Sequence, residues 1–142
     1  MNGYAYVKER GLMIEGNYAY KGVEQSCQYD ETKVAVRISG VYQYEKSPEG
    51  MKRGLTIGPI SMSLHASSDS FRSYKGGIYN DISCPTNTNH AVQAVGWGRE
   101  GNQLYFIMRN SWGATWGDQG YMKIEAIQSK DRPLGICGMF YR

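Results

Sequence analysis

Two polar side chains stand at positions where a strand could hold them for chemistry. His90 opens the stretch NHAVQAVGWG at residues 89–98, and Asn110 directly follows the apolar stretch 103–109. A histidine can transfer protons near neutral pH, and a side-chain amide can accept a hydrogen bond that orients the ring. Because a rigid element can fix such groups at a surface, His90 and Asn110 are candidates for an acid–base site. A single histidine at the start of a strand is, on its own, more often structural.

Several other kinds of chemistry leave no motif in the sequence. It has no GxSxG, GxxxxGK[ST], GxGxxG or HExxH pattern. The three cysteines, Cys27, Cys84 and Cys137, form no CxxC pair, so we expect no metal site and no cofactor. The net charge of +3 is small and scattered, so we expect no nucleic-acid partner. No apolar run approaches the roughly 20 residues of a membrane helix, so we expect no membrane partner.

The elements that must position these side chains are mainly strands. Alternation of apolar and polar residues predicts strands over residues 34–44, 60–66, 91–97, 103–109 and 121–126. We expect helices over residues 1–10 and 48–55 and a helical turn over residues 67–74. In the strand over 60–66, the alternation places His65 on the solvated face. Sequential hairpins favour an antiparallel sheet or barrel over βαβ units.

The motifs around the two candidate residues are specific to one family. The stretch NSWGATWGDQGY at residues 110–121 combines Gly and Trp positions that rarely coincide, and GPIS at 58–61 and YKGGIY at 74–79 match the approach to the family's histidine. Over nearly its whole length the chain resembles the papain-like cysteine peptidases, which include the cathepsins. The resemblance implies an α+β, papain-like fold in which residues 1–142 form mostly the β-rich, antiparallel barrel-like half. Residues 1–30 would be a remnant of the helical half and the crossover, and residues 31–142 the β-rich half.

The resemblance also implies a role for each site residue. In the family, a cysteine thiolate attacks the peptide carbonyl while paired with an imidazolium, which lowers the thiol pKa to about 3–4. His90 would be the catalytic histidine and Asn110 the asparagine that orients its ring. Trp112 would shield their hydrogen bond from water, and Trp116 would form an apolar wall on the leaving-group side. The pocket for the second residue before the cleaved bond would be lined by Ser63, Asn89 and Ala91, with a further position near Arg142.

The cysteines do not match the family's nucleophile. The family places its nucleophile about 130–150 residues before the histidine and asparagine, which corresponds to about 40–60 residues before Met1. The glutamine of the oxyanion hole would lie further upstream still. The resemblance matches Cys84 and Cys137 to a disulfide of the β-rich half, and Cys27 to one half of a second bridge. We therefore expect the C-terminal portion of a peptidase domain, starting at an internal methionine and carrying no signal peptide.

Three functions remain open. The first is a papain-like endopeptidase acting on a peptide or protein substrate, lysosomal or extracellular by family resemblance, whose N-terminal part is absent from this sequence. The second is an inactive pseudopeptidase that serves as a binding module. The third is one half of a split enzyme that pairs with a separate N-terminal half. In each case the chain alone is expected to be inactive, because it lacks the nucleophilic cysteine and the oxyanion glutamine.

Overall fold

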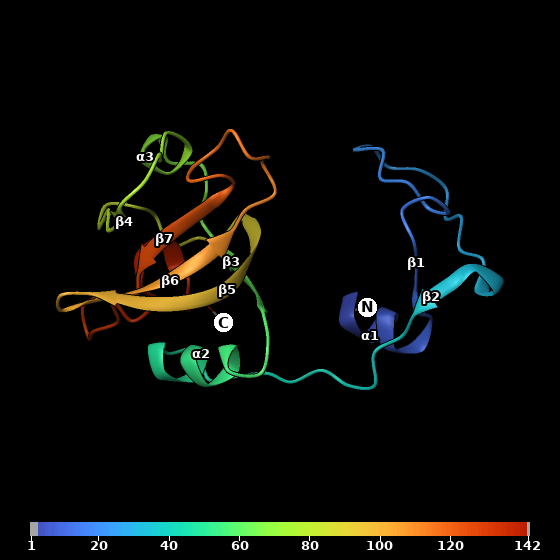
Figure 1. Ribbon diagram of the computed structural model, residues 1–142, viewed down its shortest axis with the longest axis horizontal. Coiled ribbons are helices and arrows are strands. Elements are labelled where there is room, and N and C mark those ends of the chain that lie inside the picture. Colours follow the sequence, from blue (N-terminus) through green and yellow to red (C-terminus); the bar gives the residue numbers. More distant parts are fainter. Residues whose placement is uncertain (1–2, 142) are drawn as a thin grey trace. The chain divides into compact units, whose positions relative to one another are not determined.

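A computed structural model describes residues 3–141, and the chain divides into two compact units, Met1–Gln43 and Tyr44–Arg142 (Figure 1). Each unit is described by itself. Within residues 3–141, no helix is both long enough and apolar enough to cross a bilayer.

The first unit contains a short helix and a small antiparallel pair of strands. Helix α1 (Gly3–Glu9) is followed by Gly11, whose φ of 84° is readily adopted only by glycine and turns the chain out of the helix. This confirms the helix expected over residues 1–10, apart from Met1 and Asn2, which lie outside the described residues. Strand β1 (Leu12–Met13) pairs with β2 (Val34–Val36), which follows the 3₁₀ turn η1 (Glu31–Lys33).

The strand predicted over residues 34–44 is wrong beyond Val36. Strand β1 offers only two residues for pairing, so the backbone after Val36 has no partner strand to extend the ladder. Residues 37–46 accordingly contain no helix or strand. Alternation of side chains is therefore not enough to define a strand without a neighbour to bind its backbone.

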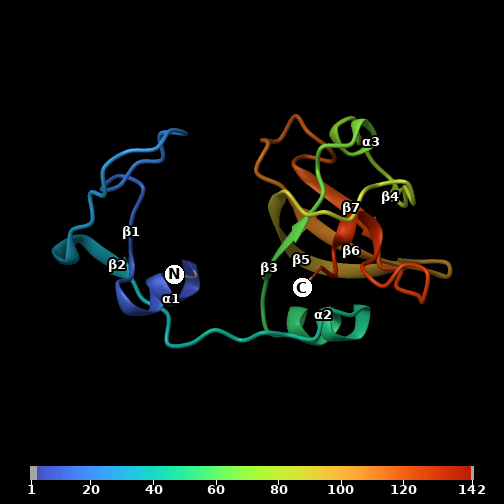
Figure 2. The same cartoon turned by 180° about the vertical axis from the view of Figure 1, so that it is seen from behind.

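The second unit is built on one five-stranded sheet, seen from both sides in Figures 1 and 2. In spatial order its strands are β3 (Ile60–Leu64), β5 (His90–Glu100), β6 (Gln103–Arg109), β7 (Tyr121–Glu125) and β4 (Ile78–Tyr79). All neighbours are antiparallel except β4 and β7, which are parallel. The α+β class and the four predicted strands of this sheet are confirmed. The sheet is open, with β3 and β4 as its edges among the described residues, and does not close into a barrel.

Short helices and a disulfide complete the second unit. Helix α2 (Pro48–Leu55) is capped by Ser47, whose hydroxyl accepts from the Gly50 N–H at 3.1 Å, and it confirms the predicted helix. Helix α3 (Asp69–Arg72) lies within the predicted helical turn, and η2 (Ile136–Gly138) lies near the C-terminus. The disulfide that the family resemblance implied is present between Cys84 and Cys137, with Cα atoms 5.0 Å apart.

The core lies on the face of the sheet that carries Ala94, Phe106, Met108, Met122 and Ile124. The prediction that His65 is solvated is wrong, because its side chain is only 8% exposed. Strand β3 ends at Leu64, so the alternation that placed His65 outward no longer applies. His65 Nδ1 lies 2.9 Å from the Asn87 carbonyl oxygen, and the His65 N–H donates to the Cys137 carbonyl at 2.8 Å. These bonds hold His65 between the residue 86–89 loop and η2.

Candidate active site

The sheet brings His90 and Asn110 together, although 20 residues separate them. His90 is the first residue of β5, and Asn110 follows the last residue of the neighbouring β6. His90 Nε2 lies 2.8 Å from Asn110 Oδ1. An amide oxygen can only accept, so Nε2 carries the hydrogen of this bond. In a neutral ring, Nδ1 is then the nitrogen that remains free to take a proton.

Asn110 is itself held in place by its own loop. Its Oδ1 also accepts from the Ser111 N–H at 2.7 Å, and its backbone N–H donates to the Gly120 carbonyl at 3.0 Å. Its Nδ2 is buried and has no hydrogen-bond partner among residues 3–141. The Asn110 amide therefore keeps both of its N–H donors unused among the described residues.

Trp112 lies against the His90 imidazole. Its ring centroid is 5.0 Å from that of His90, with the planes tilted by 37°, and the side chain is 38% exposed. Trp116 lies behind Trp112 at 5.3 Å and is only 8% exposed. Its indole N–H donates to the Arg72 carbonyl at 3.1 Å, which ties this loop to α3. The structure thus gives Trp112 an outer position and Trp116 an inner one.

A further side chain at this site was not singled out by the sequence. Phe71, from α3, is 1% exposed and contacts both tryptophans. Its ring meets Trp112 edge-on at 5.8 Å and stacks on Trp116 at 5.4 Å. The available signal was weak: Phe71 is the single large apolar residue in the polar stretch SSDSFRS at residues 67–73. Its contacts make it the buried support on which Trp112 rests.

The three residues expected to bind substrate lie close to His90 along the chain and the sheet. Ser63 of β3 and Ala91 of β5 are direct cross-strand partners. The amide of Asn89 is already engaged, because Oδ1 accepts from the Ala66 N–H at 2.9 Å and Nδ2 donates to Ser67 Oγ at 2.8 Å. Asn89 thereby fastens the end of β3 to the start of β5. Arg142 lies outside the described residues.

The three cysteines comprise one disulfide and one free thiol. Both cysteines of the second unit are joined in the disulfide, and the exposed Cys27 of the first unit is free. Within residues 3–141, no group of three or more His, Cys, Asp or Glu side chains is placed to hold a metal ion. The described part of the second unit can therefore orient a histidine and move a proton, but it offers no free thiol beside that histidine.

Comparisons with known proteins identify the family of the chain. A family profile described as papain family cysteine protease matches residues 1–140. Cathepsin K of Gallus gallus is 40% identical over 142 residues, covering 97% of this chain and 42% of that protein. A cathepsin L-like proteinase of Phaedon cochleariae is 37% identical over 139 residues, covering 96% of this chain and 42% of that protein.

Solved structures give the same result. A Carica candamarcensis cysteine protease, determined in complex with E-64, superposes with a TM-score of 0.82 at 30% identity, covering 97% of this chain and 62% of that one. The bromelain protease of Ananas comosus, in complex with the E64 inhibitor, also gives a TM-score of 0.82 at 30% identity and covers 96% and 63%. The chain spans about two-fifths of the length of the curated relatives it matches, 42% in the two named above. On this evidence it belongs to the papain family of cysteine proteases.

Proposed function

We propose that the protein is a cysteine-type peptidase in which His90 transfers the proton and Asn110 orients its ring. The observation that carries the proposal is the 2.8 Å contact from His90 Nε2 to Asn110 Oδ1. It fixes the ring and leaves Nδ1 as the basic nitrogen. Trp112 supports the role, since an apolar ring packed against the imidazole lowers the local dielectric and strengthens this hydrogen bond.

The reaction needs a thiol that faces Nδ1. That nitrogen takes the thiol proton, and the thiolate attacks the carbonyl carbon of the peptide bond. The C–N bond then breaks, and the proton on Nδ1 passes to the leaving amine. Water hydrolyses the resulting thioester and restores the thiol. His90 thus acts first as base and then as acid, while Asn110 keeps its ring in one orientation.

We infer that the thiol and the oxyanion-hole donors come from residues outside these 142. Cys84 and Cys137 are oxidised to a disulfide, and the sequence around Cys27 lacks the family's nucleophile motif. We also propose a lysosomal or extracellular location. A disulfide of this kind persists in oxidising compartments, and one relative, from Homarus americanus, is named a digestive cysteine proteinase.

The test is the intact mass and the activity of the native protein. We expect a mass above 16.0 kDa, turnover of a dipeptidyl fluorogenic amide, and covalent labelling by a cysteine-directed epoxide at a cysteine outside this sequence. His90→Ala should abolish turnover, and the recombinant 142-residue chain should show none.

Two results would replace the proposal with one of its alternatives. A native mass of 16.0 kDa without turnover would indicate a binding module. Turnover that appears only when a second chain is added, and disappears in His90→Ala, would indicate a split enzyme.

A further inference from the structure

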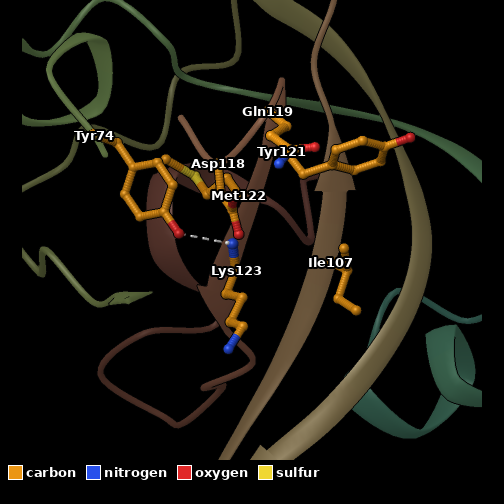
Figure 3. Close-up of a pocket in the computed structure, with 7 residues that line it drawn as sticks. All are labelled: Tyr74, Ile107, Asp118, Gln119, Tyr121, Met122 and Lys123. Carbon is orange, nitrogen blue, oxygen red and sulfur yellow. Dashed lines mark hydrogen bonds between the residues drawn. The ribbon is translucent and has the colours of Figure 1, made fainter. Parts of the chain in front are cut away.

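A second pocket lies along β6 and β7, where Ile107, Tyr121 and Lys123 alternate with the core-facing residues of the sheet. It is a pocket of about 370 Å³, shown in Figure 3 and lined by Tyr74, Ile107, Asp118, Gln119, Tyr121, Met122 and Lys123. Two of these residues belong to the turn that follows Trp116, and the others lie mainly on β6 and β7. His90 and Asn110 do not line this pocket, although its residue Tyr74 packs on Trp116, with ring centroids 5.9 Å apart.

The unpaired charge in this pocket is negative. The Lys123 ammonium lies 2.6 Å from a Glu100 carboxylate oxygen and 5.0 Å from the centre of the Tyr105 ring. Figure 3 shows that the Lys123 side chain extends away from Gln119, toward the other end of the pocket. The Asp118 carboxylate has no ion pair among residues 3–141. Only the Asp118 backbone is engaged, in two 2.9 Å bonds with Tyr121.

The remaining walls suit a long cationic side chain. Tyr121 is 38% exposed, and an aromatic face attracts a guanidinium or ammonium group. The Gln119 side chain has no hydrogen-bond partner among the described residues, and its oxygen can accept from a donor. Gln119 also has a φ of 51°, a conformation that non-glycine residues adopt rarely and that recurs at binding sites. Ile107 provides an apolar surface for an aliphatic stem.

We propose that this pocket binds an arginine side chain of a protein partner. Its guanidinium would lie between the Asp118 carboxylate and the Gln119 amide oxygen, against the Tyr121 ring, with its stem on Ile107. Arginine is favoured over lysine because its planar group can donate to two acceptors while stacking on an aromatic ring. Arg109 lies across from Tyr121 in the β6–β7 register and opposes this binding by its charge, although it does not line the pocket.

The test is a titration of the ¹⁵N-labelled protein with acetyl-Gly-Arg-Gly-amide, followed by NMR. The matched probe is the same peptide with citrulline, which has nearly the shape of arginine but no charge. We expect the arginine peptide to shift the amide signals of residues 118–123 and the citrulline peptide to bind several-fold more weakly. Asp118→Asn should weaken binding about twofold to fivefold, and Tyr121→Leu about threefold. Arg109→Gln should strengthen it about twofold.

Asp131→Asn is the control, because it removes an exposed carboxylate elsewhere in the same unit and should change nothing. The Asp118→Asn variant would keep the backbone bonds to Tyr121, so an unchanged melting temperature separates lost binding from lost folding. Equal binding of the two peptides, equal effects of Asp118→Asn and Asp131→Asn, or signal shifts confined to other residues would each overturn the proposal. The readout is binding alone, so the result stands apart from whether the protein is a peptidase.

Discussion

At the scale of single residues, the Asn110 amide determines which nitrogen of His90 can act as a base. Hydrogen bonds to charged groups contribute about 1.5–3 kcal/mol, which corresponds to roughly 10–150-fold in rate. In the native protein, Asn110→Ala should therefore lower kcat by about that factor and alter its pH profile, because the imidazolium loses its acceptor. KM should change much less.

Asn80→Ala serves as the control for this change. Asn80 is an exposed residue of the same type that lies outside the site, so kcat and the pH profile should stay as in the wild type. Should Asn110→Ala retain the wild-type kcat and pH profile, the orienting role would have to be abandoned.

Phe71 tests whether the aromatic support beneath Trp112 matters for the reaction. Aromatic pairs contribute about 0.5–1.5 kcal/mol beyond their buried area, so we expect Phe71→Leu to lower kcat/KM by about twofold to tenfold. The cause would be a change in how Trp112 covers the His90–Asn110 bond. Tryptophan fluorescence and the pH dependence of kcat, measured together, report that change.

Phe140→Leu is the matched control. Phe140 is buried to 2% exposure, and among the described residues its ring contacts neither tryptophan. Both variants should lose thermal stability, and only Phe71→Leu should change the fluorescence and the pH profile. If the two variants behave alike in every measurement, Phe71 is a core residue and nothing more.

The two histidines, His90 and His65, show when the role and the burial of a residue can be predicted from the sequence. The motifs around His90 predict its role, and the structure puts it beside Asn110. Strand alternation alone predicts an exposed His65, and that side chain is buried instead. Alternation holds only while the ladder continues, and β3 ends one residue earlier, at Leu64. The partner of His65, the Asn87 carbonyl, lies 22 residues away and leaves no local signal in the sequence.

At the scale of elements, α3 is fastened to the loop before Cys84 by one carboxylate. Asp81 accepts from Ser70 Oγ at 2.5 Å and from the Ser83 hydroxyl and N–H at 2.6 and 2.8 Å. The hydrogen bonds from Ser70 and then Ser83 lower the pKa of Asp81 from 3.8 to about 2. Ser70 precedes Phe71, so this carboxylate helps to position the element that supports the tryptophans.

The lowered pKa of Asp81 predicts a specific dependence of stability on pH. Because the folded-state pKa lies below the unfolded value, the ionised carboxylate stabilises the fold above about pH 4, and this stabilisation is lost as the pH falls toward 2. Asp81→Asn should therefore lower the melting temperature by a constant amount above pH 4, and the difference should shrink steadily as the pH falls from 4 through 2. Asp131→Asn should show no such change. A difference that stays constant down to pH 2 would contradict the assignment.

A strand can be predicted from alternating residues where a neighbouring strand is available to pair with it. The two-residue strand β4 was not predicted. The four predicted strands of the second unit, β3, β5, β6 and β7, each pair with a neighbouring strand, as Ala94 of β5 does with Met108 of β6. The stretch 34–44 has the same alternation but only Leu12 and Met13 to pair with. The aromatic support from Phe71 depends on α3 lying under Trp112, a long-range contact that no local pattern encodes.

At the scale of the whole molecule, the described hydrogen bonds and ring contacts of His90 and Asn110 all come from the second unit. The five-stranded sheet, the Cys84–Cys137 disulfide, α3 and the tryptophan loop all lie within residues 44–142. The core cluster is confined to this unit as well. The geometry of the pair should therefore depend on this unit and not on residues 1–43.

A chain of residues 44–142 should consequently fold by itself. A unit of this size can bury a substantial core, and closing the loop between Cys84 and Cys137 contributes about 4 kcal/mol. We expect a dispersed NMR spectrum and a His90 Nε2–H signal protected from exchange by its bond to Asn110. The Cys84→Ser, Cys137→Ser double variant should be markedly less stable, and Asn110→Ala should remove the protected signal without unfolding the chain. An oxidised 44–142 chain with a collapsed spectrum would show that residues 1–43 are needed to form the pair.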